Sequence, residues 1–452
     1  MNTRRNFIKT SAIAGTGLAV ANSAFGKPLF LAGSNKIKVG IIGVGERGRS
    51  LLGLLLNRDD VEVSALCDIE PITIGKAQKQ FIEKGKKEPQ IFTGGYHAYQ
   101  RLLDLKELDG VLICTPWRWH FEMAVDSMNA GKYVGLEVCG AQTIQQCWDL
   151  VDTHEKTGSH LYFMENVCYR RDVMAVMNMV RKDLFGELIH LEGGYQHDLR
   201  HVKFNDGKSA YGKGVEFGDK GYSESAWRTQ HSVDRDGEIY PTHGFGPVAK
   251  MIDIDAGNRC IQLTSTSSKA RGLHNYVVDQ GGKDHPNTKV DFKLGDVVTT
   301  VIQTANGETI MLNHDTNLPR PYSLGFRVQG EKGLWMDINN SIYVEGKSNP
   351  HRWESDEAYM KEFDHPLWKK YENLAAGAGH GGMDWFVMNA FVECVKSNAP
   401  APIDVYDGAT MSVITPLSEK SIAEGSAPQQ FPDFTRGKWK ERKNTFALDD
   451  TY

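Results

Sequence analysis

Three glycines at a fixed spacing are the residues whose chemistry is easiest to name. Gly43, Gly45 and Gly48 follow a short β-branched apolar run at 37–42 and precede a helical pattern of leucines. At this spacing the first glycine allows a tight turn, the second lets the backbone approach a pyrophosphate, and the third lets helix and strand pack closely. The helix N-terminus then offers free N–H groups and a positive dipole end to the phosphates. The pattern predicts a dinucleotide site.

A carboxylate at Asp68 refines this prediction. It follows a second apolar run, 61–67, and stands twenty residues after Gly48. A carboxylate in that place binds the ribose hydroxyls and repels a 2′-phosphate, so it favours NAD over NADP. The alternative is that Asp68 only caps the strand.

The elements that must position these residues form an α/β domain over residues 36–165. Further buried runs at 110–114 and 133–136 alternate with helical patterns, which is typical of a doubly wound parallel sheet, the Rossmann fold. Ligands of such sheets lie beyond the carboxyl ends of the strands. Besides the glycine turn and Asp68, the segments at those ends are 115–120 and 137–138.

Residues 166–452 predict a second, α+β domain. Its strand-like runs alternate with period 2 and indicate an open, mainly antiparallel sheet; they are 188–196, 260–267, 297–304, 309–315 and 341–345. We expect helices on one face of this sheet, while the other face looks towards the nicotinamide. The last helices could pack back on the first domain. Residues 200–235 show little periodicity and predict a long functional loop.

The N-terminus predicts export. Arg4 and Arg5 precede a weakly apolar stretch at 11–24, as in twin-arginine signals, and small residues at 24–26 offer a cleavage site. This stretch is too short and too rich in glycine and alanine to span a bilayer. We therefore expect residues 1–26 to be a signal peptide and the mature chain to be periplasmic. The alternative is a basic, disordered start before a short core helix.

Composition excludes several classes of protein. The net charge of −5 on 452 residues gives no reason to expect nucleic acid or an acidic membrane surface as a partner. The seven cysteines lack paired metal spacing and indicate buried free thiols rather than a disulfide scaffold. Pairs such as His197 with His201 lack metal spacing with carboxylates, so we expect no metal site.

A Rossmann half followed by an α+β half with an open sheet resembles the Gfo/Idh/MocA oxidoreductase family across essentially the whole mature chain. In that family a lysine usually follows the glutamate found here at Glu137, and an aspartate often precedes the catalytic histidine by four residues. This chain has Val138 and Ile239 in those places. Both departures argue against an ordinary sugar dehydrogenase.

They point to one branch. The segments 117–120 (Trp-Arg-Trp-His), 137–138 (Glu-Val), 165–167 (Glu-Asn-Val), 227–228 (Trp-Arg) and 240–244 (Tyr-Pro-Thr-His-Gly) are together similar to the NAD-dependent glycoside hydrolases of family 109, whose described activity is α-N-acetylgalactosaminidase. Besides the glycine turn, the resemblance implies NAD contacts from Glu46, Arg47, Asp68, Trp117, Arg118, Trp119, His120, Glu137, Val138 and Asn166. It implies a sugar site lined by Tyr195, Arg228, Tyr240, Pro241, Thr242, His243 and Tyr322.

The family's reaction removes hydride from C3 of the sugar, eliminates the C1 substituent, adds water and returns the hydride. It needs one group for the C3 hydroxyl proton and another for the C2 proton. An imidazole titrates near neutral pH, so His243 is the candidate for the hydroxyl. Tyr195 is the candidate for C2 if a nearby cation depresses its pKa. Arg228 would bind sugar or acetamido oxygens, and the rings of Trp227 and Tyr322 would face the pyranose.

Each assignment has a structural alternative. His243 could be a buried helix-cap histidine, Tyr195 a sheet-packing residue and Arg228 a surface salt-bridge partner, while Trp117 and Trp119 could pack between domains. Two other functions also stay open, an exported NAD-dependent sugar dehydrogenase and a non-catalytic NAD-binding module. The expected partner is a small glycoside or glycan terminus, and an open sheet face could pair two copies into a homo-oligomer.

Overall fold

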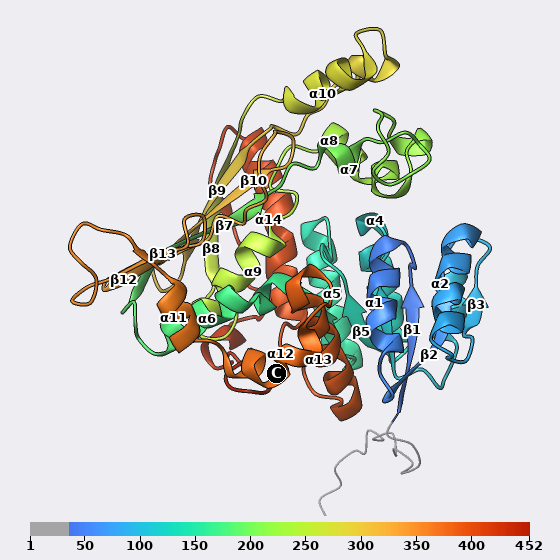
Figure 1. Cartoon of the computed structure of the whole chain (residues 1–452), viewed down its shortest axis with the longest axis horizontal. Coiled ribbons are helices and arrows are strands. Elements are labelled where there is room, and N and C mark those ends of the chain that lie inside the picture. Colours follow the sequence, from blue (N-terminus) through green and yellow to red (C-terminus); the bar gives the residue numbers. More distant parts are fainter. Residues whose placement is uncertain (1–35) are drawn as a thin grey trace, which may run out of the picture. The chain divides into compact units, whose positions relative to one another are not determined.

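Two β-sheets organise residues 36–452, which are the part of the chain that the computed structural model describes (Figure 1). The export stretch predicted at 1–26 lies outside the described residues. Within residues 36–452, no helix is both long and apolar enough to cross a bilayer.

The first sheet is parallel and has the strand order β3-β2-β1-β4-β5-β6. Its strands are β1 (Ile37–Ile42), β2 (Val61–Cys67), β3 (Gln90–Phe92), β4 (Gly110–Ile113), β5 (Tyr133–Leu136) and β6 (Leu161–Phe163). The connecting helices are α1 (Glu46–Leu56), α2 (Pro71–Glu83), α3 (Ala98–Leu103), α4 (Trp117–Asn129) and α5 (Ile144–Thr157). Strands β4 and β5 are buried at every position, as strands of a parallel sheet covered on both faces must be. The predicted Rossmann fold is confirmed.

The second sheet has nine strands in the order β14-β13-β12-β11-β7-β10-β9-β8-β15. Its strands are β7 (Leu188–Gln196), β8 (Cys260–Ser267), β9 (Val298–Thr304), β10 (Thr309–Asp315), β11 (Arg327–Gly330), β12 (Gly333–Met336), β13 (Ser341–Val344), β14 (Glu354–Ser355) and β15 (Gln429–Gln430). Strands β7 and β10 are parallel and the other neighbours are antiparallel, which confirms a mainly antiparallel sheet. The strands that the sequence did not predict have two to four residues, too few to show alternation.

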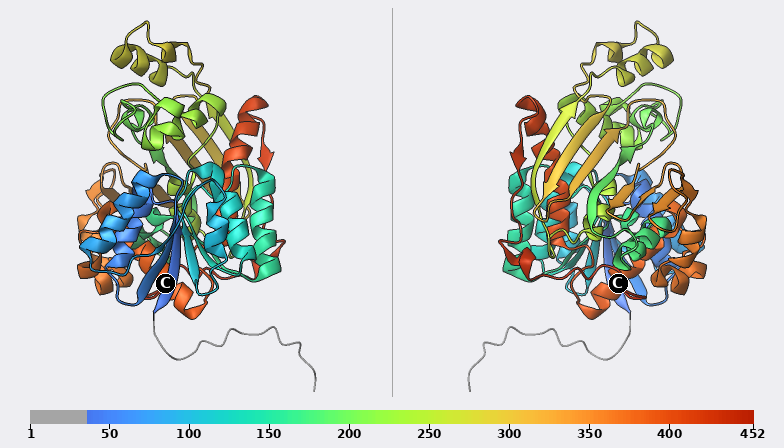
Figure 2. Two further views of the ribbon diagram at one scale, coloured as in Figure 1. Left: turned by 90° about the vertical axis from the view of Figure 1, so that its right-hand side faces the viewer. Right: turned by 90° about the vertical axis from the view of Figure 1, so that its left-hand side faces the viewer.

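Helices α9 (Thr242–Met251) and α14 (Val405–Ala423) cover one face of this sheet, and among residues 36–452 no helix covers the opposite face (Figure 2). Two glycines bring α9 very close to β7, since a Cβ on Gly193 would lie 2.4 Å from the carbonyl oxygen of Gly244. Tyr195 lies two residues further along β7 and therefore points to the same face as Gly193. The prediction that the helix-free face looks towards the nicotinamide is wrong, because the residues of the site come from the helix-covered face.

Helix α13 (Met383–Ser397) belongs to the C-terminal part of the sequence but packs on the first sheet. The ring of Phe391 lies 3.0 Å from where a Cβ of Gly135 would stand and 3.2 Å from that of Gly110. Glycines on β4 and β5 thus make room for a helix encoded more than 200 residues later.

The remaining helices are α6 (Arg171–Arg181), α7 (Arg200–Lys203), α8 (Arg228–Asp234), α10 (Gly272–Gly281), α11 (Glu357–Glu362) and α12 (Pro366–Ala375). Helices α7 and α8 lie within residues 200–235, where the sequence predicted a loop without regular elements. That prediction is wrong at both ends of the segment, because both helices have no more than seven residues and show no readable period.

Candidate active site

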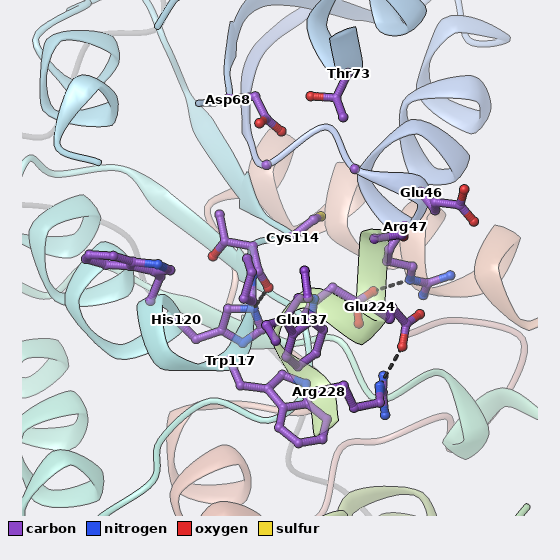
Figure 3. Close-up of a pocket in the computed structure, with 18 of the residues that line it drawn as sticks. Glu46, Arg47, Asp68, Thr73, Cys114, Trp117, His120, Glu137, Glu224 and Arg228 are labelled. Carbon is purple, nitrogen blue, oxygen red and sulfur yellow. Dashed lines mark hydrogen bonds and ion pairs between the residues drawn. The ribbon is translucent and has the colours of Figure 1, made fainter. Parts of the chain in front are cut away.

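A cavity of about 820 Å³ lies at the carboxyl ends of the first sheet's strands and extends to β7 and α9 (Figure 3). Predicted residues that line it are Gly43, Gly45, Glu46, Arg47, Asp68, Trp117, Arg118, Trp119, His120, Glu137, Val138, Asn166, Tyr195, Arg228, Tyr240 and His243. The two predicted sets, for the dinucleotide and for the sugar, therefore share one cavity.

The glycine turn fits a pyrophosphate. Gly43 has a φ of +87°, which favours glycine, and a Cβ on Gly48 would lie 2.0 Å from the carbonyl oxygen of Gly43. Gly45 caps helix α1, where no side chain accepts from the free N–H groups, and a Cβ there would meet no atom within 4 Å. The turn thus leaves an open cradle in front of a helix N-terminus, the arrangement that binds phosphate.

Asp68 holds the same turn from the side. Its carboxylate accepts the backbone N–H of Val44 at 2.7 Å and that of Glu70 at 2.9 Å. The carboxylate is therefore fixed at the carboxyl end of β2, where it lines the cavity and can meet the ribose hydroxyls of NAD.

Arg47 joins the two halves of the chain. Its guanidinium donates to Glu137 and to Asp384, at 2.6 Å each, and Figure 3 shows the Glu137 contact at the cavity wall. Burial alone would raise the pKa of Asp384, but hydrogen bonds from His380 and Arg47 hold it well below its ordinary value. The amide of Asn166 also donates to Asp384, at 2.9 Å. No local pattern indicated this role of Asp384, since Arg47 and Asn166 lie 337 and 218 positions away in the chain.

His120 fixes two loops of the cavity. Its ring nitrogens contact the carbonyl oxygens of Thr115 at 2.6 Å and of Cys139 at 2.9 Å, which follow β4 and β5. Burial lowers the pKa of His120 to about 4, although the hydrogen bonds to these carbonyl oxygens act in the opposite direction.

The two tryptophans of the 117–120 segment have different surroundings. Trp117 packs against Trp227 and Tyr240, with ring centroids 5.1 and 5.4 Å apart, and so both joins the halves and lines the cavity. Trp119 stacks on Tyr96 at 5.0 Å at the edge of the cavity.

His243 is the second residue of α9, and Glu165 fixes its orientation. Nδ1 lies 2.7 Å from the fully buried Glu165 carboxylate, so Nδ1 carries the proton and donates. This leaves Nε2 free to accept a proton on the side of Tyr240, whose hydroxyl is 3.4 Å away. A buried helix-cap role does not describe this ring, since it lines the cavity and its partner is a carboxylate. The sequence showed the Glu-Asn-Val motif but not this role of Glu165.

Tyr195 stacks on Tyr240, with centroids 4.4 Å apart, and its edge faces His243. Its hydroxyl lies 3.4 Å from Nδ1 of His197. Burial raises the pKa of Tyr195 to about 12, although the charge of Arg228 opposes this shift. The expectation that a nearby cation depresses this pKa is therefore wrong, because desolvation of the phenolate outweighs the cation.

Arg228 is partly buried and forms a 2.5 Å ion pair with Glu224, as Figure 3 shows. Its guanidinium also lies over the ring of Trp117, 4.9 Å from the centroid. It is thus a salt-bridge partner, but inside the cavity wall and not on the surface. Glu224 was not singled out from the sequence.

Four predicted residues do not line the cavity. Gly48 contacts the glycine turn, and Pro241 and Thr242 are buried where α9 begins. Tyr322 is half exposed, and its ring lies edge-on to Tyr195 at 6.5 Å. All seven cysteines are free, as predicted. Within residues 36–452, no group of three or more histidine, cysteine or carboxylate side chains could hold a metal ion.

Comparison with known protein families covers both halves of the chain. A model described as "Glycosyl hydrolase 109, C-terminal domain" matches residues 169–441, and one described as "Oxidoreductase family, NAD-binding Rossmann fold" matches residues 37–165. A glycosyl hydrolase family 109 protein of Stenotrophomonas maltophilia (strain K279a) is 54% identical over 99% of both chains. An alpha-N-acetylgalactosaminidase of Tannerella forsythia is 50% identical over 99% of this chain and 100% of its own.

Solved structures share the fold at low identity. An NAD binding oxidoreductase from Klebsiella pneumoniae has a TM-score of 0.64 at 13% identity, and levoglucosan dehydrogenase in complex with NADH has 0.62 at 17%. Each covers 88% of this chain and 100% of its own. Together with a glycine cradle, Asp68 and a cavity that serves both halves, these matches show that the chain belongs to glycoside hydrolase family 109 and is an NAD-dependent glycosidase.

Proposed function

We propose that this glycosidase removes terminal α-linked N-acetylgalactosamine from small glycosides or glycan ends. The support for this sugar is the alpha-N-acetylgalactosaminidase of Tannerella forsythia, which is 50% identical and matches this chain over nearly its whole length. The observation that carries the chemistry is the shared cavity, in which His243 and Tyr195 lie beside the dinucleotide cradle. When bound, NAD supplies a hydride acceptor for C3 of the sugar, which leaves a carbonyl there and makes the C2 proton acidic.

The residues of the chain perform the proton transfers. His243 accepts the proton of the C3 hydroxyl at Nε2, and Glu165 stabilises the imidazolium that forms. Tyr195 lies next to it and exchanges the C2 proton, so that the C1 substituent can leave and water can add to C1. Arg228 donates to sugar or acetamido oxygens from the cavity wall.

A panel of aryl glycosides of both anomers tests this proposal. We expect cleavage of the aryl α-N-acetylgalactosaminide without net formation of NADH, because the hydride returns to the sugar in each turnover. Steady accumulation of NADH would show a sugar dehydrogenase instead, and cleavage of another anomer or sugar would correct the substrate.

We further propose that the twin-arginine stretch at 1–26 exports the folded, NAD-loaded protein to the periplasm. Its support is the Arg4-Arg5 pair before a weakly apolar stretch.

We also propose that copies pair through the helix-free face of the second sheet, where Val301 is exposed and lies opposite Met311 on β10. The mass of the mature protein in solution, measured by light scattering, tests the pairing.

A further inference from the structure

The site contains two tyrosine–histidine pairs. The hydroxyl oxygen of Tyr240 lies 3.4 Å from Nε2 of His243, and the hydroxyl oxygen of Tyr195 lies 3.4 Å from Nδ1 of His197. The two tyrosine rings stack on each other at 4.4 Å. The proposed reaction likewise needs proton transfers at two neighbouring carbons, C3 and C2. Glu165 and His243 serve the proton transfer at C3. Tyr195 serves the transfer at C2, and His197 is the histidine that its hydroxyl contacts.

His197 occupies a fixed position just outside the cavity. It is the first residue after β7, and its backbone N–H donates to the carbonyl oxygen of Asp315 at 2.8 Å. Its ring packs edge-on against Tyr322 at 5.0 Å and is half-buried. Tyr195 lines the cavity and His197 does not, so His197 reaches the cavity through its contact with the Tyr195 hydroxyl.

The groups around His197 favour the neutral form of its ring. Burial is the main cause that lowers its pKa, and the charges of His201 and Arg228 act in the same direction. Asp198 and Glu224 oppose the shift without reversing it. A neutral ring can accept a proton at Nδ1 while it carries a proton at Nε2.

We propose that His197 is a positioning residue that relays protons between Tyr195 and solvent. This inference rests on the proposed redox-assisted cleavage. Tyr195 passes its hydroxyl proton to Nδ1 of His197, and His197 releases its Nε2 proton to water. The phenolate of Tyr195 takes the C2 proton, the C2–H electron pair forms the C1–C2 double bond, and the C1–O pair leaves with the oxygen of the departing group, which water protonates. Water addition at C1 runs these transfers in reverse.

The relay explains how a tyrosine of high pKa can exchange the C2 proton. A proton taken from C2 would otherwise stay on the Tyr195 hydroxyl and return to the same carbon. With His197 in place, the hydroxyl exchanges its proton with solvent before water adds.

Turnover in D₂O tests the relay. For the unchanged enzyme acting on an aryl α-N-acetylgalactosaminide, we expect deuterium at C2 of nearly all released sugar, measured by mass spectrometry and NMR. For His197→Gln we expect the solvent exchange rate at C2 to fall about 10- to 100-fold, with the original hydrogen retained at C2. A merely structural role would lower cleavage without changing the isotope at C2.

Two further variants complete the design. His190→Gln changes a half-buried histidine within β7, whose ring contacts Thr309 at 2.7 Å. We expect this variant to exchange the hydrogen at C2 as the unchanged enzyme does. His197→Ala should regain C2 deuterium when imidazole is added, and its NAD content and thermal unfolding show whether it is folded. Full C2 exchange in both His197 variants would overturn the relay. Absence of C2 deuterium in the unchanged enzyme would overturn it as well, whereas failure to cleave the aryl glycoside would overturn the proposed function instead.

Discussion

At the scale of single residues, Glu165 decides which nitrogen of His243 can act on a sugar. The carboxylate accepts a hydrogen bond from Nδ1–H, so Nε2 is the nitrogen that can accept a proton. We predict that His243→Ala lowers kcat about 10²- to 10⁴-fold, the usual contribution of a general base. The bound NAD should be unchanged, because the glycine turn and Asp68 lie on other elements. Cleavage of an aryl glycoside and the absorbance of released NAD measure the two effects. Near-normal turnover would remove His243 from the mechanism.

Two glycines of the same turn should respond differently to alanine. A methyl group at Gly45 meets no protein atom but would stand in the cradle, so Gly45→Ala should leave thermal unfolding of the NAD-free protein unchanged. Its affinity for NAD should fall about tenfold or more. A methyl group at Gly48 collides with the Gly43 carbonyl, so Gly48→Ala should destabilise the protein itself by about 1–3 kcal/mol. Equal unfolding temperatures for both variants would contradict this difference.

Glu238 gives stability a pH dependence. It is fully buried, and burial raises its pKa to about 8 from its ordinary value of 4.5. The folded state then holds a proton that the unfolded state releases, so the stability that this proton gives is complete below pH 4.5 and is lost as the pH rises to 8. Glu238→Gln has no such proton, and its stability relative to the unchanged protein should increase from pH 5 to pH 8. Denaturant unfolding at both pH values measures this; a difference independent of pH would show that Glu238 does not titrate in this range.

At the scale of elements, α13 completes the cofactor side of the cavity. Asp384 lies in its first turn and orients Arg47 on α1. Asp384→Asn removes a charged hydrogen bond of about 1.5–3 kcal/mol, and we predict that NAD affinity, measured by titration calorimetry, falls about tenfold. Lys396→Ala is the matched control, since it removes the ion pair with Asp60 at the other end of α13, away from the cavity. Equal losses in the two variants would show that the effect is general loosening of the helix.

The length of each element decided what could be predicted from the sequence. Strands such as β1 and β4 were visible because continuous burial requires a continuous apolar run. Strand β6 has only three residues and was not predicted, so the sequence did not show that Glu165 follows a strand. Asp384 was not predicted, because no local pattern reports a hydrogen bond to a residue 337 positions away.

At the scale of the whole molecule, the export proposal predicts a change of location without a change of chemistry. Replacing Arg4 and Arg5 by lysine should keep the protein in the cytoplasm, because twin-arginine signals depend on that pair. The retained protein should still bind NAD and cleave the aryl glycoside, since the signal lies outside residues 36–452. Activity in separated cytoplasmic and periplasmic fractions measures the location. An unchanged distribution would show that this pair does not direct export.

The hydrogen bond between Arg47 and Asp384 also has a consequence for biosynthesis. A ribosome makes the glycine turn early and α13 only after most of the polypeptide has emerged. Until then Arg47, beside the glycine turn, can pair with Glu137 but not with Asp384. The chain can therefore bind the dinucleotide with full affinity only late in translation or after its release from the ribosome.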